Sequence, residues 1–222
     1  MEKLVTFEEV RNNPEIRAYI LRADETLASL GYTEHAFAHV MRSAENASYI
    51  LRELGYPQRE QELAQIAGYM HDIGNVVNRV AHAQSGALMS FRILRNMGME
   101  PDEVAYIISA IGNHDEGTAA PVNAIAAALI LADKSDVRRS RVRNSDITNF
   151  DIHDRVNYAV ERSVLTLSHD LREILLELTI DTQISPVMSY FEIFMQRMLL
   201  CSHAAEFLKI RFGLVINGQR LL

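Results

Sequence analysis

Apolar residues recur at intervals of three and four along most of the first 140 residues, which is the spacing of amphipathic helices. Several of these stretches carry helix signals at their ends: Asn13 and Pro14 begin the first, Thr33 caps the second, and Pro101 begins the fifth. The short connections predict that neighbouring helices pack closely. The predicted helices span residues 14–31, 33–54, 58–71, 82–97, 101–114 and 121–136.

The pattern changes after about residue 140. The segment RNSDITNFDIHD, residues 143–154, is polar and poorly periodic. SVLTLS (163–168) and LREILLELTI (171–180) read as strands joined by the turn residues Ser-His-Asp. The apolar positions of 171–180 also fit a helical face, so a helix there is the alternative.

One more helix and one more strand complete the predicted elements. The helix covers about residues 186–208, and KIRFGLVING forms the strand, which ends at Asn217-Gly218. We therefore expect a mainly α protein with an all-helical domain over residues 1–140 and a small C-terminal α+β appendage over residues 141–222.

Composition limits the partners and the location. A formal net charge of −7 disfavours a surface that coats nucleic acid, because such binding depends on Lys and Arg. No apolar run approaches the roughly 18 residues of a membrane span. The start MEKLVTFEEVRNN lacks the basic and apolar parts of a signal peptide, so we expect a cytoplasmic protein without membrane contact. The single cysteine, Cys201, lies in an apolar run and predicts a buried, inert thiol.

Four arginines crowd into RRSRVR, residues 138–143. Such a group can bind an anionic small molecule, because guanidinium groups pair well with phosphate and carboxylate. The alternative is an ordinary solvated helix end or loop.

Polar residues interrupt the apolar faces of the second and third predicted helices. His39 borders an apolar face beside the small residues Ala36 and Ser43, which leaves room for a ligand, although a satisfied core histidine is the alternative. His71 and Asp72 lie at the buried end of the next helix. A buried carboxylate is costly unless its charge is matched, and a helix C-terminus is itself negative. We therefore expect a cation beside Asp72.

Three further residues extend this pattern. Asp133 ends the apolar run NAIAAALILAD, so it either pairs with a basic residue or binds a metal ion. His82 begins one predicted helix and His114 ends another. Imidazole with carboxylate is the ligand mixture of borderline transition metals. Four histidines and two aspartates exceed the needs of one catalytic ion, and they suit two ions that share a bridging carboxylate, for which Asp72 is the natural choice.

The order of these residues resembles the HD superfamily of metal-dependent phosphohydrolases, over about residues 30–140. The matching pieces are HVMRSAENA around His39, AGYMHDIGN around His71 and Asp72, HAQSGA from His82, AIGNH at His114 and LILADKSD around Asp133. The resemblance implies an HD-domain helical bundle whose six ligands hold two divalent transition-metal ions, iron before manganese or zinc. The likeness is to the branch that includes dinucleoside tetraphosphate hydrolases, and the chain lacks the GYP element of the cyclic-dinucleotide phosphodiesterases.

The activity implied by this resemblance is hydrolysis of a phosphoester or phosphoanhydride by metal-activated hydroxide. The substrate is then a nucleotide or another small phosphorylated molecule. Asp72 is the central catalytic residue, and Lys134 and Arg42 are candidates to steady phosphate charge, with an ordinary ion pair as the alternative for each. Asp115 is a candidate partner for an imidazole N–H group or a water molecule.

Two other functions remain open. The same ligand set occurs in HD-like di-iron oxygenases, and a non-catalytic sensor stabilised by metal is the third candidate. The apolar C-terminal helix leads us to expect a homodimer. The remaining histidines keep no family spacing. We expect capping or solvent contacts for His35, polar turn-like stretches around His153 and His169, and a place in the C-terminal helix for His203.

Overall fold

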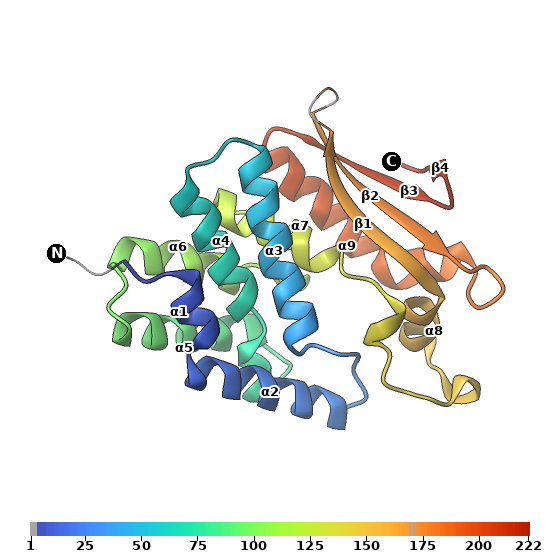
Figure 1. Cartoon of the computed structure of the whole chain (residues 1–222). Helices are drawn as coiled ribbons and strands as arrows, with labels where there is room; N and C mark the ends of the chain where they lie inside the picture. The colour runs from blue at the N-terminus through green and yellow to red at the C-terminus, as the bar shows by residue number, and fades with distance from the viewer. Residues whose placement is uncertain (1–3, 169, 171) are drawn as a thin grey trace.

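Helices fill the first two thirds of the chain, and the computed structural model, which describes residues 4–168, 170 and 172–222, shows them packed against one another (Figure 1). In chain order they are α1 (Phe7–Asn12), α2 (Pro14–Ser29), α3 (Phe37–Glu53), α4 (Gln58–Met70), η1 (Ile73–Val76), α5 (His82–Asn96), α6 (Pro101–Gly112) and α7 (Ala124–Lys134). The hydrophobic pattern therefore predicted the helices from α2 to α7 in the correct order.

The C-terminal part combines helices with a small sheet. Its elements are η2 (Arg139–Arg141), η3 (Ile147–Asn149), α8 (Ile152–Ala159), β1 (Val160–Ser168), β2 (Glu173–Ile180), α9 (Val187–Phe207), β3 (Arg211–Ile216) and β4 (Gln219–Arg220). The expected fold class, mainly α with a C-terminal α+β part, is confirmed. The term all-helical is wrong for the chain as a whole, because this sheet forms part of it.

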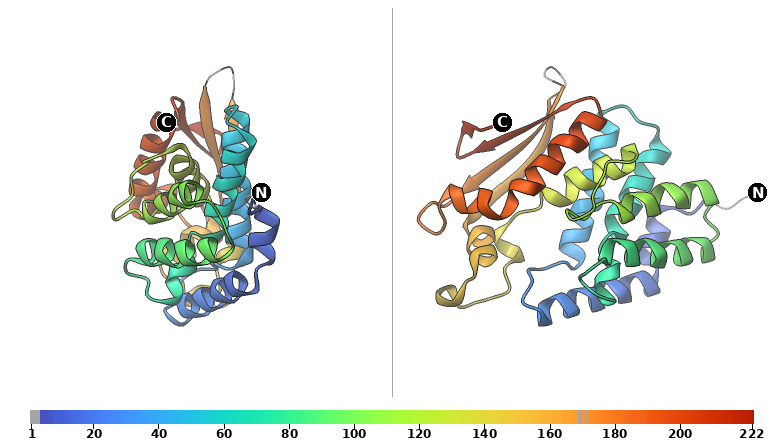
Figure 2. Two further views of the ribbon diagram at one scale, coloured as in Figure 1. Left: turned by 90° about the vertical axis from the view of Figure 1, so that its left-hand side faces the viewer. Right: turned by 180° about the vertical axis from the view of Figure 1, so that it is seen from behind.

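The sheet has the order β1-β2-β3-β4. The β1–β2 and β3–β4 pairs are antiparallel, whereas β2 and β3 are parallel and are therefore joined by a crossover, which α9 supplies. Figure 2 shows α9 running along the sheet, and the same helix packs against α7. Asn217 and Gly218 have φ angles of 52° and 77°, the left-handed conformation that a tight β3–β4 hairpin requires. The strand predicted in KIRFGLVING and its turn are confirmed.

Two predicted helix ends are wrong. Thr33 does not cap α3, because Ala36 occupies the N-cap position and the His35 backbone N–H instead donates to Asp24 Oδ1 at 2.7 Å, which holds this segment as a loop. Helix α7 is shorter than residues 121–136 because the Asn123 side chain caps it and accepts from the Ala126 N–H at 2.8 Å.

Two short helices were not predicted. Helix α1 has 6 residues and begins with a capping box between Thr6 and Glu9, and α8 has 8 residues with Asp151 as its N-cap. Stretches this short show too few turns for hydrophobic periodicity to be recognised. The residues 171–180 form a strand from Glu173 onward, so the helical alternative is wrong there. Leu171 and His169, the central residue of the predicted Ser-His-Asp turn, lie outside the described residues.

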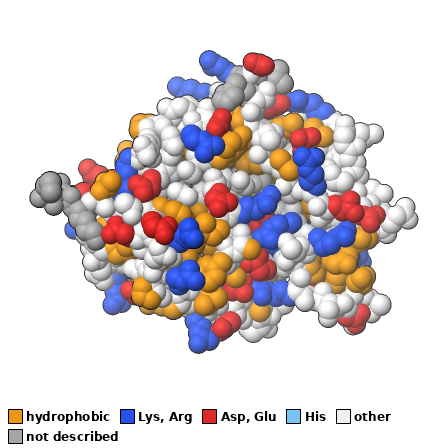
Figure 3. Space-filling view, viewed as in Figure 1, with side chains coloured by type: hydrophobic (Ala, Val, Ile, Leu, Met, Phe, Trp, Pro, Cys, Tyr) orange, Lys and Arg blue, Asp and Glu red, His pale blue; other side chains and the backbone are white. Residues whose placement is uncertain are grey.

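The face shown in Figure 3 mixes Lys and Arg with Asp and Glu, so that neither charge gathers into one broad patch on that face. Among the residues that the structure describes, no helix combines the length and the apolar character needed to cross a membrane.

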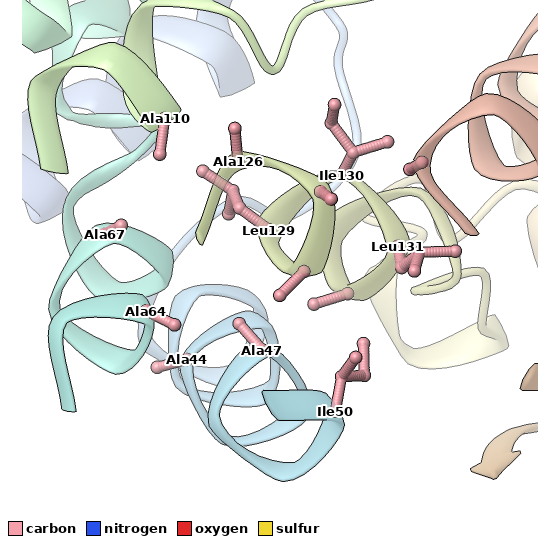
Figure 4. Packing of buried hydrophobic residues seen from close by; sticks show 14 of the residues in the cluster. Ala44, Ala47, Ile50, Ala64, Ala67, Ala110, Ala126, Leu129, Ile130 and Leu131 are labelled. Carbon is pink, nitrogen blue, oxygen red and sulfur yellow. The ribbon is translucent and has the colours of Figure 1, made fainter. Parts of the chain in front are cut away.

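Helix α7 lies at the centre of the core, and every residue from Ile125 to Lys134 is buried. Figure 4 shows small side chains on α3 and α4, such as Ala47 and Ala64, facing this region. Gly68 on α4 also lies close to α3, since a Cβ atom at Gly68 would be only 2.7 Å from the Ala44 Cα atom. The small residues let the helix backbones approach, and this packing brings polar residues of α3, α4 and α7 to the same region of the core.

Candidate metal centre

The six residues predicted as metal ligands lie together inside the helical part. They come from different elements: His39 from α3, His71 and Asp72 from the junction of α4 with η1, His82 from the start of α5, His114 from the loop after α6, and Asp133 from α7. We call these six residues the His/Asp cluster. All of them are buried, and the most exposed, Asp133, has a relative accessibility of 9%.

Potential ligand atoms within the cluster face one another at short range. The Nε2 atom of His39 lies 3.3 Å from His71 Nε2, and His82 Nε2 lies 3.3 Å from His114 Nε2. Asp72 lies between these pairs, with Oδ2 at 3.6 Å from His39 Nε2 and Oδ1 at 3.5 Å from His82 Nε2. The ligand atoms form three overlapping groups, each within 4.8 Å: His39-His71-Asp72, His71-His114-Asp133 and Asp72-His82-His114.

The other ring nitrogen of each histidine in the cluster faces an acceptor. A carbonyl or carboxylate oxygen only accepts, so it favours the proton on Nδ1 and leaves Nε2 with a free lone pair. Lone pairs at 3.3 Å repel each other unless a positive charge lies between them, and a divalent metal ion supplies that charge. The donor set therefore fits a divalent metal. The Nδ1 partners are Asp136 Oδ2 at 2.8 Å for His39, Gly68 O at 2.8 Å for His71, Arg79 O at 3.0 Å for His82 and Ile111 O at 2.6 Å for His114.

The electrostatics of the cluster favour positive charge at one place and neutral imidazole at others. Burial opposes protonation of His71, but Asp72 and Asp133 outweigh it and raise the pKa of His71 to about 10. Burial, together with the neighbouring His71, holds the pKa of His114 well below its usual range, and burial lowers the pKa of His82. The carboxylates thus favour a cation near His71 Nε2, while His82 and His114 stay in the neutral form that binds metals.

Local backbone features orient the cluster. A Cβ atom on Gly74 would lie 2.0 Å from the His82 carbonyl oxygen and 2.4 Å from the Gly86 nitrogen, so only glycine lets η1 approach the first turn of α5 so closely. Ala81 precedes His82 with a φ of 60°, a conformation that is unfavourable for a residue with a side chain. Strain of this kind is often found at functional sites.

His39 is held by a residue that the sequence analysis did not select. Asp136 is buried, and its Oδ2 atom accepts from His39 Nδ1 at 2.8 Å. Its Oδ1 atom accepts from Arg138 Nε at 2.8 Å and lies 3.2 Å from Arg42 Nε, while Arg141 Nη1 lies 3.6 Å from Oδ2. Burial raises the pKa of Asp136, but the bond from His39 and the charge of Arg141 outweigh it, and the pKa falls below its usual range.

The predicted phosphate-binding residues have partners inside the protein. Arg42 Nη2 donates to the Ser163 carbonyl at 2.7 Å, in addition to its contact with Asp136. Lys134 Nζ lies 2.7 Å from Asp133 Oδ2, whereas Asp133 Oδ1 faces His39 at 3.3 Å. One oxygen of Asp133 therefore has a basic partner, while the other faces the cluster, and metal binding by Asp133 stays a prediction.

The remaining candidates lie around the cluster. Asp115 is partly exposed, with Oδ1 at 3.9 Å from His82 Nε2. Asn75, which was not predicted, donates to Asp72 Oδ1 at 2.9 Å and fixes that carboxylate. The expectation of only solvent or capping contacts for His35 is wrong, because its ring packs edge-on against His39 with centroids 5.3 Å apart. His203 is exposed on α9.

The arginine-rich segment binds within the protein. Arg138 pairs with Asp136 and with Glu34, and the Arg141 Nε atom donates to the Glu34 carbonyl at 2.9 Å. Arg139 packs over the Tyr158 ring with its Cζ atom 4.7 Å from the centroid. The segment therefore ties the chain after α7 to the loop before α3, so it is not a freely solvated loop.

A cavity of about 610 Å³ adjoins the cluster. Its inner wall includes His35, which packs on His39, and Arg79, whose Nη1 atom lies 3.4 Å from His82 Nε2. The outer wall comes from α8 and α9, and it includes Asn157 and Phe194. The pair His153-Asp154, expected in a polar turn, belongs to α8 and lines this cavity. The C-terminal part therefore helps to enclose the space beside the cluster.

Comparison with known proteins agrees with this geometry. The model of the HD domain family matches residues 36–151, just over half of the chain, and this region contains the whole His/Asp cluster. The chain therefore belongs to the HD domain family.

The individual relatives share less than 30% sequence identity with this chain. The chain is 25% identical over 179 residues to the uncharacterized protein MJ1020 of Methanocaldococcus jannaschii, a match that covers 70% of this chain and 69% of the relative. It is also similar to a crystal structure of a predicted HD superfamily hydrolase from an uncultured Thermotogales bacterium. That match has 28% identity, a TM-score of 0.45, and coverage of 56% of this chain and 67% of the other.

Proposed function

We propose that the protein is a metal-dependent phosphohydrolase that cleaves a phosphoester or phosphoanhydride of a small phosphorylated substrate. Membership of the HD domain family and the composition of the His/Asp cluster support a metal-dependent hydrolase. The observation that carries the proposal is the position of Asp72, whose two oxygens face different histidines, His39 and His82. We infer that the cluster holds two divalent ions and that Asp72 bridges them, with iron preferred to manganese or zinc.

Two bound ions would lower the pKa of a coordinated water molecule to about 7 and neutralise phosphoryl oxygens. The residues of the chain hold and orient this centre. Asp136 keeps the proton of His39 on Nδ1, and Asn75 fixes one oxygen of Asp72. Lys134 partly neutralises Asp133 through Oδ2, the carboxylate oxygen that does not face His39. The contacts of Arg42 favour a role in positioning Asp136 over the predicted contact with phosphate.

The first test combines elemental analysis of the purified protein with a screen of phosphate monoesters, diesters and nucleotides. We expect close to two transition-metal ions per chain and release of phosphate or of a nucleotide. The variant His71→Gln should lose both metal and activity, because it removes a central donor from two of the ligand groups. The matched control His203→Gln changes an exposed histidine on α9 and should retain both. A metal-free protein with undiminished phosphatase activity would contradict the proposal.

The same experiment separates the alternatives. Consumption of dioxygen with a mixed-valent iron signal, without phosphate release, would favour an oxygenase. Full metal occupancy without turnover of any phosphoester or any consumption of dioxygen would favour a non-catalytic sensor.

A further inference from the structure

Arg79 is the lining residue of the cavity whose charge has no evident purpose in the fold. Its Nη1 atom lies 3.4 Å from His82 Nε2 and 3.3 Å from Asn75 Oδ1, both neutral groups. Its Cζ atom lies 5.5 Å from the centroid of the Tyr32 ring. The guanidinium group is therefore placed between the His/Asp cluster and the cavity by contacts that do not neutralise it.

Other basic side chains near the cluster are neutralised by carboxylates. Arg42 and Arg141 face Asp136, and Lys134 faces Asp133. Arg79, by contrast, forms no ion pair with any carboxylate in the described part of the chain, although it is only partly exposed. A partly buried cation without a counter-charge is unfavourable, so this position is suited to an anion that enters from the cavity.

The identity of that anion follows from the contact with His82, and this step rests on the proposed function. When His82 Nε2 serves as a metal ligand, its lone pair is no longer available to Arg79. The guanidinium group then lies beside a second positive centre, and an anion with several oxygens can neutralise both. A phosphoryl group matches the paired N–H donors of arginine in geometry.

We propose that Arg79 binds the phosphoryl group of the substrate and that the substrate carries this group at a terminus. A terminal phosphoryl group has three non-bridging oxygens, enough to meet both the metal centre and the two donors of a guanidinium group. A phosphodiester has only two non-bridging oxygens and one negative charge, so it neutralises these partners less completely. The cavity of about 610 Å³ lies within the usual range of small-molecule sites, so the substrate class is a small phosphate monoester or a terminal phosphoanhydride.

The binding test uses orthophosphate as the probe, titrated calorimetrically into the metal-loaded protein. Arg79→Gln removes the charge, Arg79→Lys keeps it without the paired donors, and Arg92→Gln is the control on the exposed side of α5. We expect Arg79→Gln to weaken phosphate binding by about 10-fold or more. Arg79→Lys should bind with intermediate affinity, and the control should stay within about twofold of the unchanged protein. Metal content should be equal in all four proteins.

The kinetic test compares p-nitrophenyl phosphate with bis(p-nitrophenyl) phosphate. We expect the monoester to be the better substrate and its KM to rise in Arg79→Gln. An Arg79→Gln variant that binds orthophosphate as tightly as the unchanged protein would overturn the inference, as would a preference for the diester. Hydrolysis with an unchanged KM in Arg79→Gln would leave the proposed function intact and reject the role of Arg79. Phosphate binding that depends on Arg79, without hydrolysis of any ester, would support this role and reject the phosphohydrolase.

Discussion

Replacement of Asp136 by asparagine tests whether a single buried carboxylate couples the metal centre to the stability of the fold. Its Oδ2 atom accepts from His39 Nδ1 at 2.8 Å, and its Oδ1 atom accepts from Arg138 Nε at 2.8 Å. Asparagine has the same shape but presents one oxygen and one NH2 group. Whichever way the amide turns, its N–H donors face either the donor of His39 or the donors of the arginines. The substitution therefore removes a charge and also opposes donor to donor.

The expected loss can be derived from these contacts. Removing one partner of a buried ion pair costs about 3–5 kcal/mol, and domains of ordinary stability unfold with about 5–15 kcal/mol. We expect Asp136→Asn to lower the free energy of unfolding of the metal-free protein by about 3 kcal/mol or more. Because His39 loses its orienting partner, the affinity for metal should fall by roughly 10- to 100-fold.

Urea denaturation of the metal-free protein measures the first effect, and calorimetric titration with the metal found in the purified protein measures the second. Glu161→Gln provides the control, since Glu161 is an exposed carboxylate whose nearest partner is Arg139 at 3.8 Å. The control should change the free energy of unfolding by less than about 0.5 kcal/mol. If Asp136→Asn matched the unchanged protein in both measurements, the coupling described for Asp136 would be refuted.

Further predictions concern packing, the thiol, the metal and assembly. Gly74→Ala should destabilise the protein by about 1–3 kcal/mol or more in urea denaturation, because its Cβ would overlap the His82 carbonyl. The control Gly117→Ala has no neighbour closer than 4.0 Å and should be nearly neutral, so equal effects would contradict the packing argument. Burial raises the pKa of the Cys201 thiol to about 12, so Ellman's reagent at pH 8 should label it only after denaturation. An unfolded thiol ionises at about pH 8.5, so the Cys201 thiol should lower the free energy of unfolding as pH rises from there towards about 12. Labelling of the folded protein at pH 8 would contradict the burial of this thiol. A chelator should lower the melting temperature, measured by calorimetry, because metal binds the folded cluster, and an unchanged melting temperature would argue against a resident ion. Light scattering should detect a homodimer, whose expected contact includes the exposed apolar side chains Met188 and Leu199 of α9, and a monomer would reject this expectation.

The sequence was informative where apolar periodicity is interrupted. A histidine or aspartate on a face that is otherwise apolar must be buried when the helix packs, and burial of polar groups requires partners. This reasoning selected His39, Asp72 and Asp133. In the structure, His39 Nε2 lies 3.6 Å from Asp72 Oδ2 and 3.3 Å from Asp133 Oδ1. The helices that carry them were predicted for the same reason, because their apolar faces are long enough to show the helical period.

The partners of these residues could not be selected in this way. Asp136 follows the end of α7 and Arg79 lies in the loop between η1 and α5, and in such connections a charged residue is the ordinary expectation. Their roles depend on tertiary contacts over long sequence separations, such as the 97 residues between His39 and Asp136. The outer wall of the cavity was missed for other reasons, since α8 is short and α9 is apolar over a broad face, which predicts burial and not a cavity wall.

The outer wall of the cavity also has a consequence for how such a protein can diversify. The region matched by the HD family model ends at residue 151, where α8 is about to begin, and α9 is held at both ends by the parallel strands β2 and β3. Substitutions on the cavity side of α9 can therefore accumulate without altering the residues of the His/Asp cluster or their spacing. A chemist who wishes to redirect this protein towards another ligand should randomise one helix in the last third of the chain and leave the buried histidines untouched.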